Sequence, residues 1–321
     1  MDQTLDKKRV FIFLGIAFLI AWGTALVIYL TGGLSESPIV IPSLQLSLAY
    51  VLMSTLFMGA PAIAHILTRL LTREGWKGLW LKPGFKKNGR FWAIAWVLPG
   101  ILTILGAAAF FYLFPHTFDS NLTALQSQLS AANKAYGASE AIAIDPWMVL
   151  ILQGVQAILL APILNAIPTF GEEFGWRAYL LPKLLPLGSK KAIIISGIIW
   201  GVWHWPLILM GYNYGTDYPA APWLGLLGMV WVTVGLGIIF SWLTLRSGSV
   251  WPAVIAHGAT NGIAAIGNFA LIGKTNPLLG PTPLGVIGGL FFAILAINLW
   301  LHPTALRLPE QNEVQPGTAG N

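Results

Sequence analysis

Long apolar stretches determine the fold class of this chain. Stretches of about 18 residues or more, enough to cross a hydrocarbon core of roughly 30 Å, follow one another along it. They lie near residues 10–31, 40–68, 91–114, 147–182, 192–211, 223–245, 250–272 and 284–301. With 56% hydrophobic and only 9% charged residues, the chain has too little polar surface for a water-soluble globule. The sequence therefore predicts an all-α, polytopic membrane protein with about eight transmembrane helices.

The basic residues predict how these helices are oriented. Lys and Arg are frequent at the N-terminus and in the connectors 68–90 and 182–191, whereas 31–38 and 212–222 contain none. Because cytoplasmic loops carry the excess of Lys and Arg, both termini are predicted to be cytoplasmic. The net charge of +6 is divided among these connectors, which indicates contact with membrane lipid and no nucleic-acid partner. In a prokaryotic cell the multi-pass protein would reside in the plasma membrane.

The stretches suggest three parts of the chain. Residues 1–145 would hold N-terminal transmembrane helices and a long outer connector, in which "LTALQSQLSAANKAY" (122–136) is expected to form a helix at the interface. Residues 146–302 would form the catalytic transmembrane core, and residues 303–321 a disordered tail.

The fourth apolar stretch is too long for a simple span. Residues 147–182 would form a helix of roughly 54 Å at 1.5 Å per residue, and the stretch contains Pro162 and Pro168. Proline interrupts the hydrogen bonds of a helix, so we expect a break near "IPTFG".

Three charges just after this break stand out, because a charge at mid-membrane costs about 2.5 to 3.5 kcal/mol. Glu173 and Arg177 are four positions apart and can pair on one helical face. A purely structural ion pair is one interpretation of these two residues. Glu172 points about 100° away from Glu173, and with Thr169 it also fits a T-x-x-E capping box.

Further polar residues lie in later apolar stretches. His204 stands among tryptophans, and His257 and Asn261 are four apart on one face; each could be a hydrogen-bonded packing residue. Glu172, His204 and His257, however, all lie about 16 to 20 Å from the nearest basic residue on the predicted cytoplasmic side, at 1.5 Å per residue. Because three separate stretches place ionisable groups at a similar depth, we expect these groups to meet in one site.

This set of residues is suited to hydrolysis by water. A carboxylate and an imidazole can share the deprotonation of a water molecule, and His257 and Asn261 can donate hydrogen bonds to an oxyanion. The chain has no cysteine, which excludes a thiol nucleophile. No metal ligand is assigned, but Glu and His are zinc ligands in hydrolytic sites, so zinc is the alternative cofactor.

Three motifs carry a resemblance to a known family. The segments "EEFGWR" (172–177), "WGVWH" (200–204) and "HGATN" (257–261), in that order, resemble the CPBP family of intramembrane proteases. That family includes type II CAAX prenyl endopeptidases and bacteriocin-processing and immunity proteins. The resemblance covers roughly residues 150–265. Trp200 stands where many members have Phe, and we expect this difference to change only the packing of the cavity.

The resemblance implies an eight-helix fold and an intramembrane endopeptidase. At the matching positions, Glu172 and His204 would activate the attacking water. His257 and Asn261 would form the oxyanion hole.

The same resemblance gives Glu173 and Arg177 the task of shaping and neutralising the site. The substrate would be a peptide or membrane protein, with prenylated CAAX proteins and peptide maturation as alternatives. Two other functions stay open: a non-catalytic immunity protein of the same fold, and a proton-coupled transporter, for which mid-membrane Glu and His are also expected.

Overall fold

The computed structural model describes residues 5–135 and 145–308, most of which are helical. The α-helices are α1 (Lys7–Leu30), α2 (Leu48–Leu52), α3 (Met58–Leu71), α4 (Phe85–Leu113), α5 (Thr123–Ala135), α6 (Pro146–Leu164), α7 (Ala166–Gly175), α8 (Leu181–Leu184), α9 (Ser189–Trp203), α10 (Trp205–Leu209), α11 (Trp223–Ser247), α12 (Trp251–Ile263) and α13 (Leu290–Leu301). Two π-helical segments are η2 (Met53–Phe57) and η4 (Trp176–Leu180). Short 3-10 segments are η1 (Pro42–Leu44), η3 (Pro115–Thr117), η5 (Leu185–Leu187) and η6 (Ile266–Ala270). Strands β1 (Ile39–Ile41) and β2 (Leu46–Ser47) form a small antiparallel pair.

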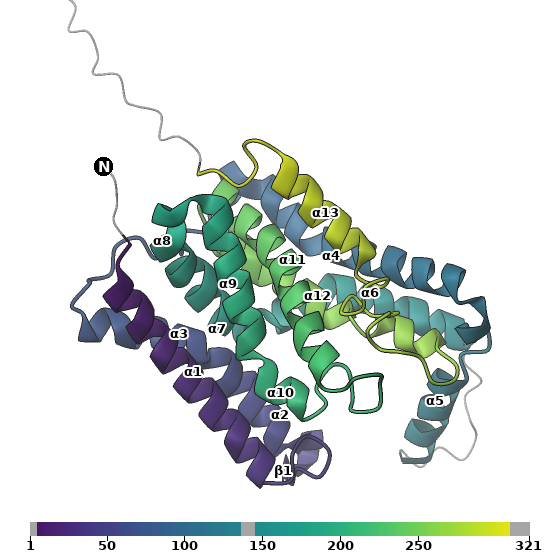
Figure 1. The fold of residues 1–321 in the computed structure, drawn as a ribbon. Coiled ribbons are helices and arrows are strands. Elements are labelled where there is room, and N and C mark those ends of the chain that lie inside the picture. Colours follow the sequence, from purple (N-terminus) through teal and green to yellow (C-terminus); the bar gives the residue numbers. More distant parts are fainter. Residues whose placement is uncertain (1–4, 136–144, 309–321) are drawn as a thin grey trace, which may run out of the picture.

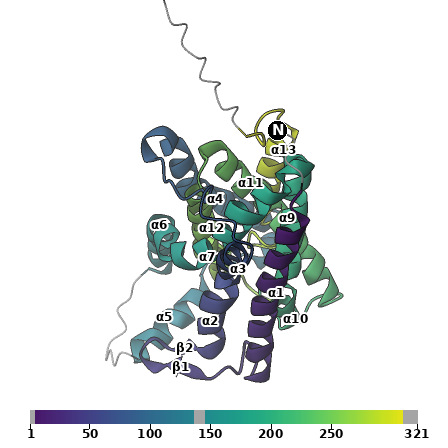
Figure 2. The same cartoon turned by 90° about the vertical axis from the view of Figure 1, so that its left-hand side faces the viewer.

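The helices form a bundle in which α9, α11 and α12 are central. Figure 1 shows α1, α2 and α3 on one side of them and α4, α6 and α13 on the other. The β1–β2 pair and α5 lie at one end of the bundle, and the start of α1 lies at the opposite end (Figures 1 and 2), where Figure 1 also shows α8. The all-α, multi-pass fold predicted from the sequence is therefore confirmed.

Five helices in the described part of the chain are long and apolar enough to cross a membrane. They are α1, the continuous helix of α2, η2 and α3, and then α4, α6 and α11. The other three predicted spans contain shorter helices, of 15 residues in α9, 13 in α12 and 12 in α13. Helix α9 ends at Trp203 shortly before Pro206, which has no N–H to continue the helix. The count of eight spans and the cytoplasmic position of both termini stay predictions.

The fourth apolar stretch is broken, as predicted. Helix α6 ends at Leu164 and α7 begins at Ala166, so the break lies at Asn165, two residues before the segment "IPTFG" near which it was predicted. Pro168 is accommodated in the first turn of α7, where backbone N–H groups have no helical partner to lose.

Two further expectations are settled by the position of α7. The capping box of Thr169 and Glu172 is wrong, because Thr169 lies inside α7 and its hydroxyl donates to the carbonyls of Asn165 at 2.8 Å and Val254 at 3.1 Å. Residues 123–135 of the segment 122–136 form a helix, α5, whereas Tyr136 lies outside the described residues and the place of the helix at a membrane interface stays a prediction. In the predicted tail, residues 309–321 lie outside the described residues.

Helices α3 and α7 approach each other closely through two glycines. Gly171 and Gly175 are four apart, hence on one face of α7. A Cβ atom at Gly171 would lie 2.6 Å from the Met58 carbonyl oxygen, and one at Gly175 would lie 2.6 Å from the Pro61 carbonyl carbon. Small residues at this spacing let membrane helices pack backbone to backbone. Glu172 and Glu173 lie between the two glycines, so the packing of α7 on α3 holds the backbone of both glutamates in place.

We expect Gly175→Ala to destabilise the protein by about 1 to 3 kcal/mol, because the added methyl group would overlap the backbone of α3. The measurement is the midpoint of thermal unfolding in detergent. Gly154→Ala in α6 is the matched control, since the nearest atom to its Cβ position is 3.9 Å away. Equal midpoints for the two variants would contradict close α3–α7 packing as a source of stability.

Candidate active site

The residues singled out in the sequence meet at one cavity of about 330 Å³. Its wall includes Glu172 from α7, Trp200 and His204 from the end of α9, and His257 and Asn261 from α12. The prediction from depth that these groups lie together is therefore confirmed by their position. Their chemical roles stay predictions.

Glu172 is buried and held in one orientation. Its side chain is 2% exposed, and its Oε2 accepts a hydrogen bond of 2.7 Å from the indole Nε1 of Trp200. The expectation that Trp200 affects only packing is therefore wrong, because a phenylalanine at this position has no N–H to donate. The other carboxylate oxygen, Oε1, is the one that Trp200 leaves available.

The tautomer of His204 follows from its hydrogen bond. Its Nδ1 lies 2.9 Å from the backbone carbonyl of Trp200. A carbonyl oxygen only accepts, so Nδ1 carries the hydrogen, and in the neutral ring Nε2 keeps its lone pair. The ring also packs edge-on against Trp203, with centroids 4.7 Å apart. His204 thus combines a fixed ring with an unprotonated nitrogen suited to accept a proton.

Behind the cavity wall, Glu173 joins two partners. Its Oε1 accepts from Arg177 Nη1 at 3.1 Å and from His257 Nδ1 at 2.9 Å. All three side chains are buried. The Glu173–Arg177 pair predicted from the i,i+4 spacing is confirmed, whereas the sequence offered no signal for the bond between residues 84 positions apart.

Aromatic rings complete the surroundings of Arg177. The guanidinium lies 4.3 Å from the centroid of the Trp200 ring and 5.4 Å from that of Phe240. Within the described part of the chain, Arg177 Nε and Glu173 Oε2 have no hydrogen-bond partner. The buried pair is therefore stabilised by its one ion-pair contact, by the hydrogen bond from His257 to Glu173 and by cation–π attraction to Arg177.

The bond to Glu173 defines what His257 can do. Because a carboxylate accepts, Nδ1 of His257 carries a hydrogen, and only Nε2 is left to act in the cavity. In the neutral ring Nε2 is an acceptor, so the ring must be protonated before it can donate from that atom. Glu173 stabilises such an imidazolium. Asn261 lines the cavity one turn farther along α12 and has an amide that donates without any change of charge.

The placement of the donor groups does not fit the zinc alternative. Among residues 5–135 and 145–308, no group of three or more His, Asp or Glu side chains is placed to hold a metal ion. The contacts of Trp200 with Glu172 Oε2 and of both histidines through Nδ1 leave Glu172 Oε1 and the two Nε2 atoms as the remaining acceptors. Zinc accepts ligands of these types, so only their placement disfavours a metal. We therefore derive no step through a metal.

Comparison with known proteins agrees with the motifs. Residues 148–263 match the family model described as "Type II CAAX prenyl endopeptidase Rce1-like". This segment is therefore similar to Rce1-like endopeptidases, and it is called the Rce1-like core below. A stretch of 93 residues is also 36% identical to "CAAX prenyl protease 2" of Methanococcus maripaludis, covering 28% of this chain and 34% of that protein. The chain thus aligns with about one third of the length of this curated relative, and the resemblance stated from the motifs is confirmed for the core.

The Rce1-like core does not enclose the cavity alone. Part of its lining comes from the second apolar stretch and includes Tyr50, Met53, Ser54 and Phe57. The hydropathy pattern marked these residues only as part of a span. Three of the four lie in η2, and such π-helical insertions occur often at functional sites. The division of the chain at residue 145 stays a prediction.

Proposed function

We propose that this protein is an intramembrane endopeptidase in which Glu172 and His204 activate a water molecule. The observation that supports the proposal is the single cavity lined by an oriented carboxylate and an imidazole with an unprotonated Nε2. Attack by water on an amide requires a base that takes a proton from the water, and this cavity offers a carboxylate and an imidazole for that purpose. The match of residues 148–263 to a CAAX endopeptidase model supports the same activity.

The proposed reaction proceeds through a tetrahedral intermediate. The water oxygen attacks the peptide carbonyl carbon while its proton passes to Glu172 or His204. The oxyanion accepts hydrogen bonds from the Asn261 amide and from Nε2–H of protonated His257, whose positive charge Glu173 offsets. Collapse of the intermediate breaks the C–N bond, and the stored proton moves to the leaving amine.

The substrate would be a peptide or the tail of a membrane protein. The cavity wall is largely apolar and includes Met53, Phe57 and Met229, which suits apolar side chains or a lipid group. The name of the methanogen relative refers to prenylated CAAX proteins, so a farnesylated peptide is the first substrate to test. Membrane lipid is the expected surrounding of the whole protein.

The test is cleavage of a quenched fluorescent peptide library by the purified protein in detergent, with and without farnesylation. We expect cleavage by the wild type, retained after treatment with a metal chelator, and a clear preference within the library. If neither the library nor native membrane-protein tails are cut by folded protein, the endopeptidase proposal is wrong and the immunity alternative gains support. Flux of a solute driven by a pH gradient in proteoliposomes, without cleavage, would favour the transporter.

A further inference from the structure

A second buried polar cluster lies where α3 meets α7, and its His65, Arg69 and Glu74 come from outside the Rce1-like core. His65 of α3 is fully buried, and its Nδ1 lies 2.9 Å from the backbone carbonyl of Phe174. Its Nε2 accepts a hydrogen bond of 2.7 Å from Arg69 Nε. Because one ring nitrogen faces a carbonyl and the other faces a guanidinium, the neutral Nδ1–H tautomer is fixed.

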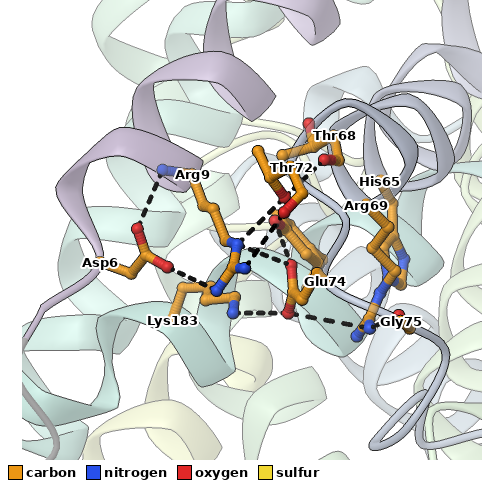
Figure 3. A network of polar contacts seen from close by, with 10 residues as sticks. Asp6, Arg9, His65, Thr68, Arg69, Thr72, Glu74, Gly75 and Lys183 are labelled. Atoms are coloured by element: carbon orange, nitrogen blue, oxygen red, sulfur yellow. Dashed lines mark hydrogen bonds and ion pairs between the residues drawn. The ribbon is translucent and has the colours of Figure 1, made fainter.

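The cluster continues from Arg69 to Glu74, as Figure 3 shows. Arg69 Nη1 donates to the Gly75 carbonyl at 2.6 Å and lies 3.7 Å from Glu74 Oε1. Lys183 Nζ lies 2.6 Å from the same oxygen, and the Tyr179 hydroxyl donates to Glu74 Oε2 at 2.9 Å. His65 is therefore the buried end of a series of polar contacts that runs through Arg69 and Glu74 to Lys183 in α8.

The carboxyl group of Glu74 is ionised in this series of contacts. Burial alone would raise the pKa of its carboxyl group, but the hydrogen bonds from Lys183 and Tyr179 and the charges of Lys183 and Arg69 outweigh burial and lower it below the usual value. The carboxylate thus keeps its charge at neutral pH and orients Arg69, and Arg69 in turn orients His65.

His65, at the buried end of these contacts, meets α7 next to the two glutamates. Phe174 directly follows Glu173, and the π-helical segment η4 begins two residues later. In a π-helix each N–H bonds to the carbonyl five residues earlier instead of four, so the helix is wider and its side chains are rotated relative to a regular helix. A side-chain donor on the Phe174 carbonyl fixes the place where one geometry changes into the other.

We infer that His65, held by Arg69 and Glu74, is a positioning residue that sets the rotation of α7 and hence the direction of Glu172 and Glu173. The inference rests on the proposed function, because it concerns the same carboxylates. A rotation of about 10° displaces a carboxylate that lies roughly 6 Å from the helix axis by about 1 Å, and a displacement of that size can cost about 10²-fold in rate.

If His65 had only a packing role, its loss would have a different effect. Loss of a packing residue lowers the fraction of folded protein, so that Tm falls while the folded molecules keep their kcat. Loss of a positioning residue lowers kcat in folded molecules and leaves KM nearly unchanged. The two roles are therefore distinguished by kinetics on protein whose folding has been verified.

The experiment compares His65→Leu, His65→Asn and Thr68→Val in detergent with a cleaved peptide. His65→Leu removes the donor, and we expect kcat to fall about 10²-fold with KM within about threefold of wild type. His65→Asn keeps an amide N–H near the Nδ1 position and should restore most of kcat. Thr68→Val is the matched control, because Thr68 is buried one turn from His65 and its hydroxyl has no hydrogen-bond partner in the described residues.

The outcomes separate this inference from the proposed function. Wild-type kcat in His65→Leu, or equal losses in His65→Leu and His65→Asn, would overturn the positioning role while Glu172→Gln stays inactive. Full activity of Glu172→Gln would instead overturn the proposed function. If His65→Leu does not fold, Arg69→Gln replaces it, and unchanged kcat in that variant contradicts the inference.

Discussion

Glu172→Gln is expected to lower kcat for peptide cleavage by about 10²- to 10⁴-fold, the range typical for loss of a general base. Glutamine has the size of glutamate, and its carbonyl oxygen can still accept the indole N–H of Trp200. It cannot take a proton from water. KM and Tm should therefore stay close to the wild-type values, and the loss should fall on the chemical step.

Two further variants sharpen this result. Trp200→Phe keeps the aromatic ring but removes the N–H donor, so we expect a smaller loss than in Glu172→Gln. Glu36→Gln, in the exposed connector after α1, is the control for removal of a carboxylate without contact with the cavity. Wild-type kcat in Glu172→Gln would show that another group activates water.

Arg177→Met is expected to destabilise the protein by about 3 to 5 kcal/mol, because it leaves the buried carboxylate of Glu173 without its cation. Methionine fills a similar volume and suits the apolar surroundings of Trp200 and Phe240. The measurement is thermal unfolding in detergent, read from the tryptophan fluorescence of the protein.

The double variant Glu173→Gln/Arg177→Met separates charge from packing. Removal of both charges should restore most of the lost stability, because no uncompensated charge is left in the interior. Cleavage should stay low, since glutamine can accept the His257 N–H but cannot stabilise the imidazolium. A double variant as unstable as Arg177→Met alone would show that the two residues are not energetically coupled.

Hydropathy and residue spacing predicted those structural features that are determined within a single helix. The long spans α1, α4 and α11 follow from their apolar length, and the Glu173–Arg177 contact follows from a separation of four on a helix. The similar predicted depth of Glu172, His204 and His257 in the membrane predicted that they lie close together. These inferences need no knowledge of how helices pack.

The contacts that could not be predicted join different helices. The bond between Glu173 and His257 and the one between Trp200 and Glu172 depend on the relative rotation of α7, α9 and α12. The capping box failed because the break at Asn165 comes before Pro168, so Thr169 is already within α7. The π-helical segments leave no distinct trace in composition, because the same residues are compatible with an ordinary helix.

The cavity is lined by three stretches of sequence. The groups proposed to act on water belong to residues 148–263, which match the Rce1-like family model, whereas residues 50–58 and Pro283 and Leu284 add further lining from outside that segment. We expect substitutions at Tyr50, Met53 or Ser54 to change which peptide is preferred while the reacting atoms stay in place. A relative's first two helices would also replace His65 and Arg69, so a hybrid that carries them should keep the reaction only where these two residues are retained.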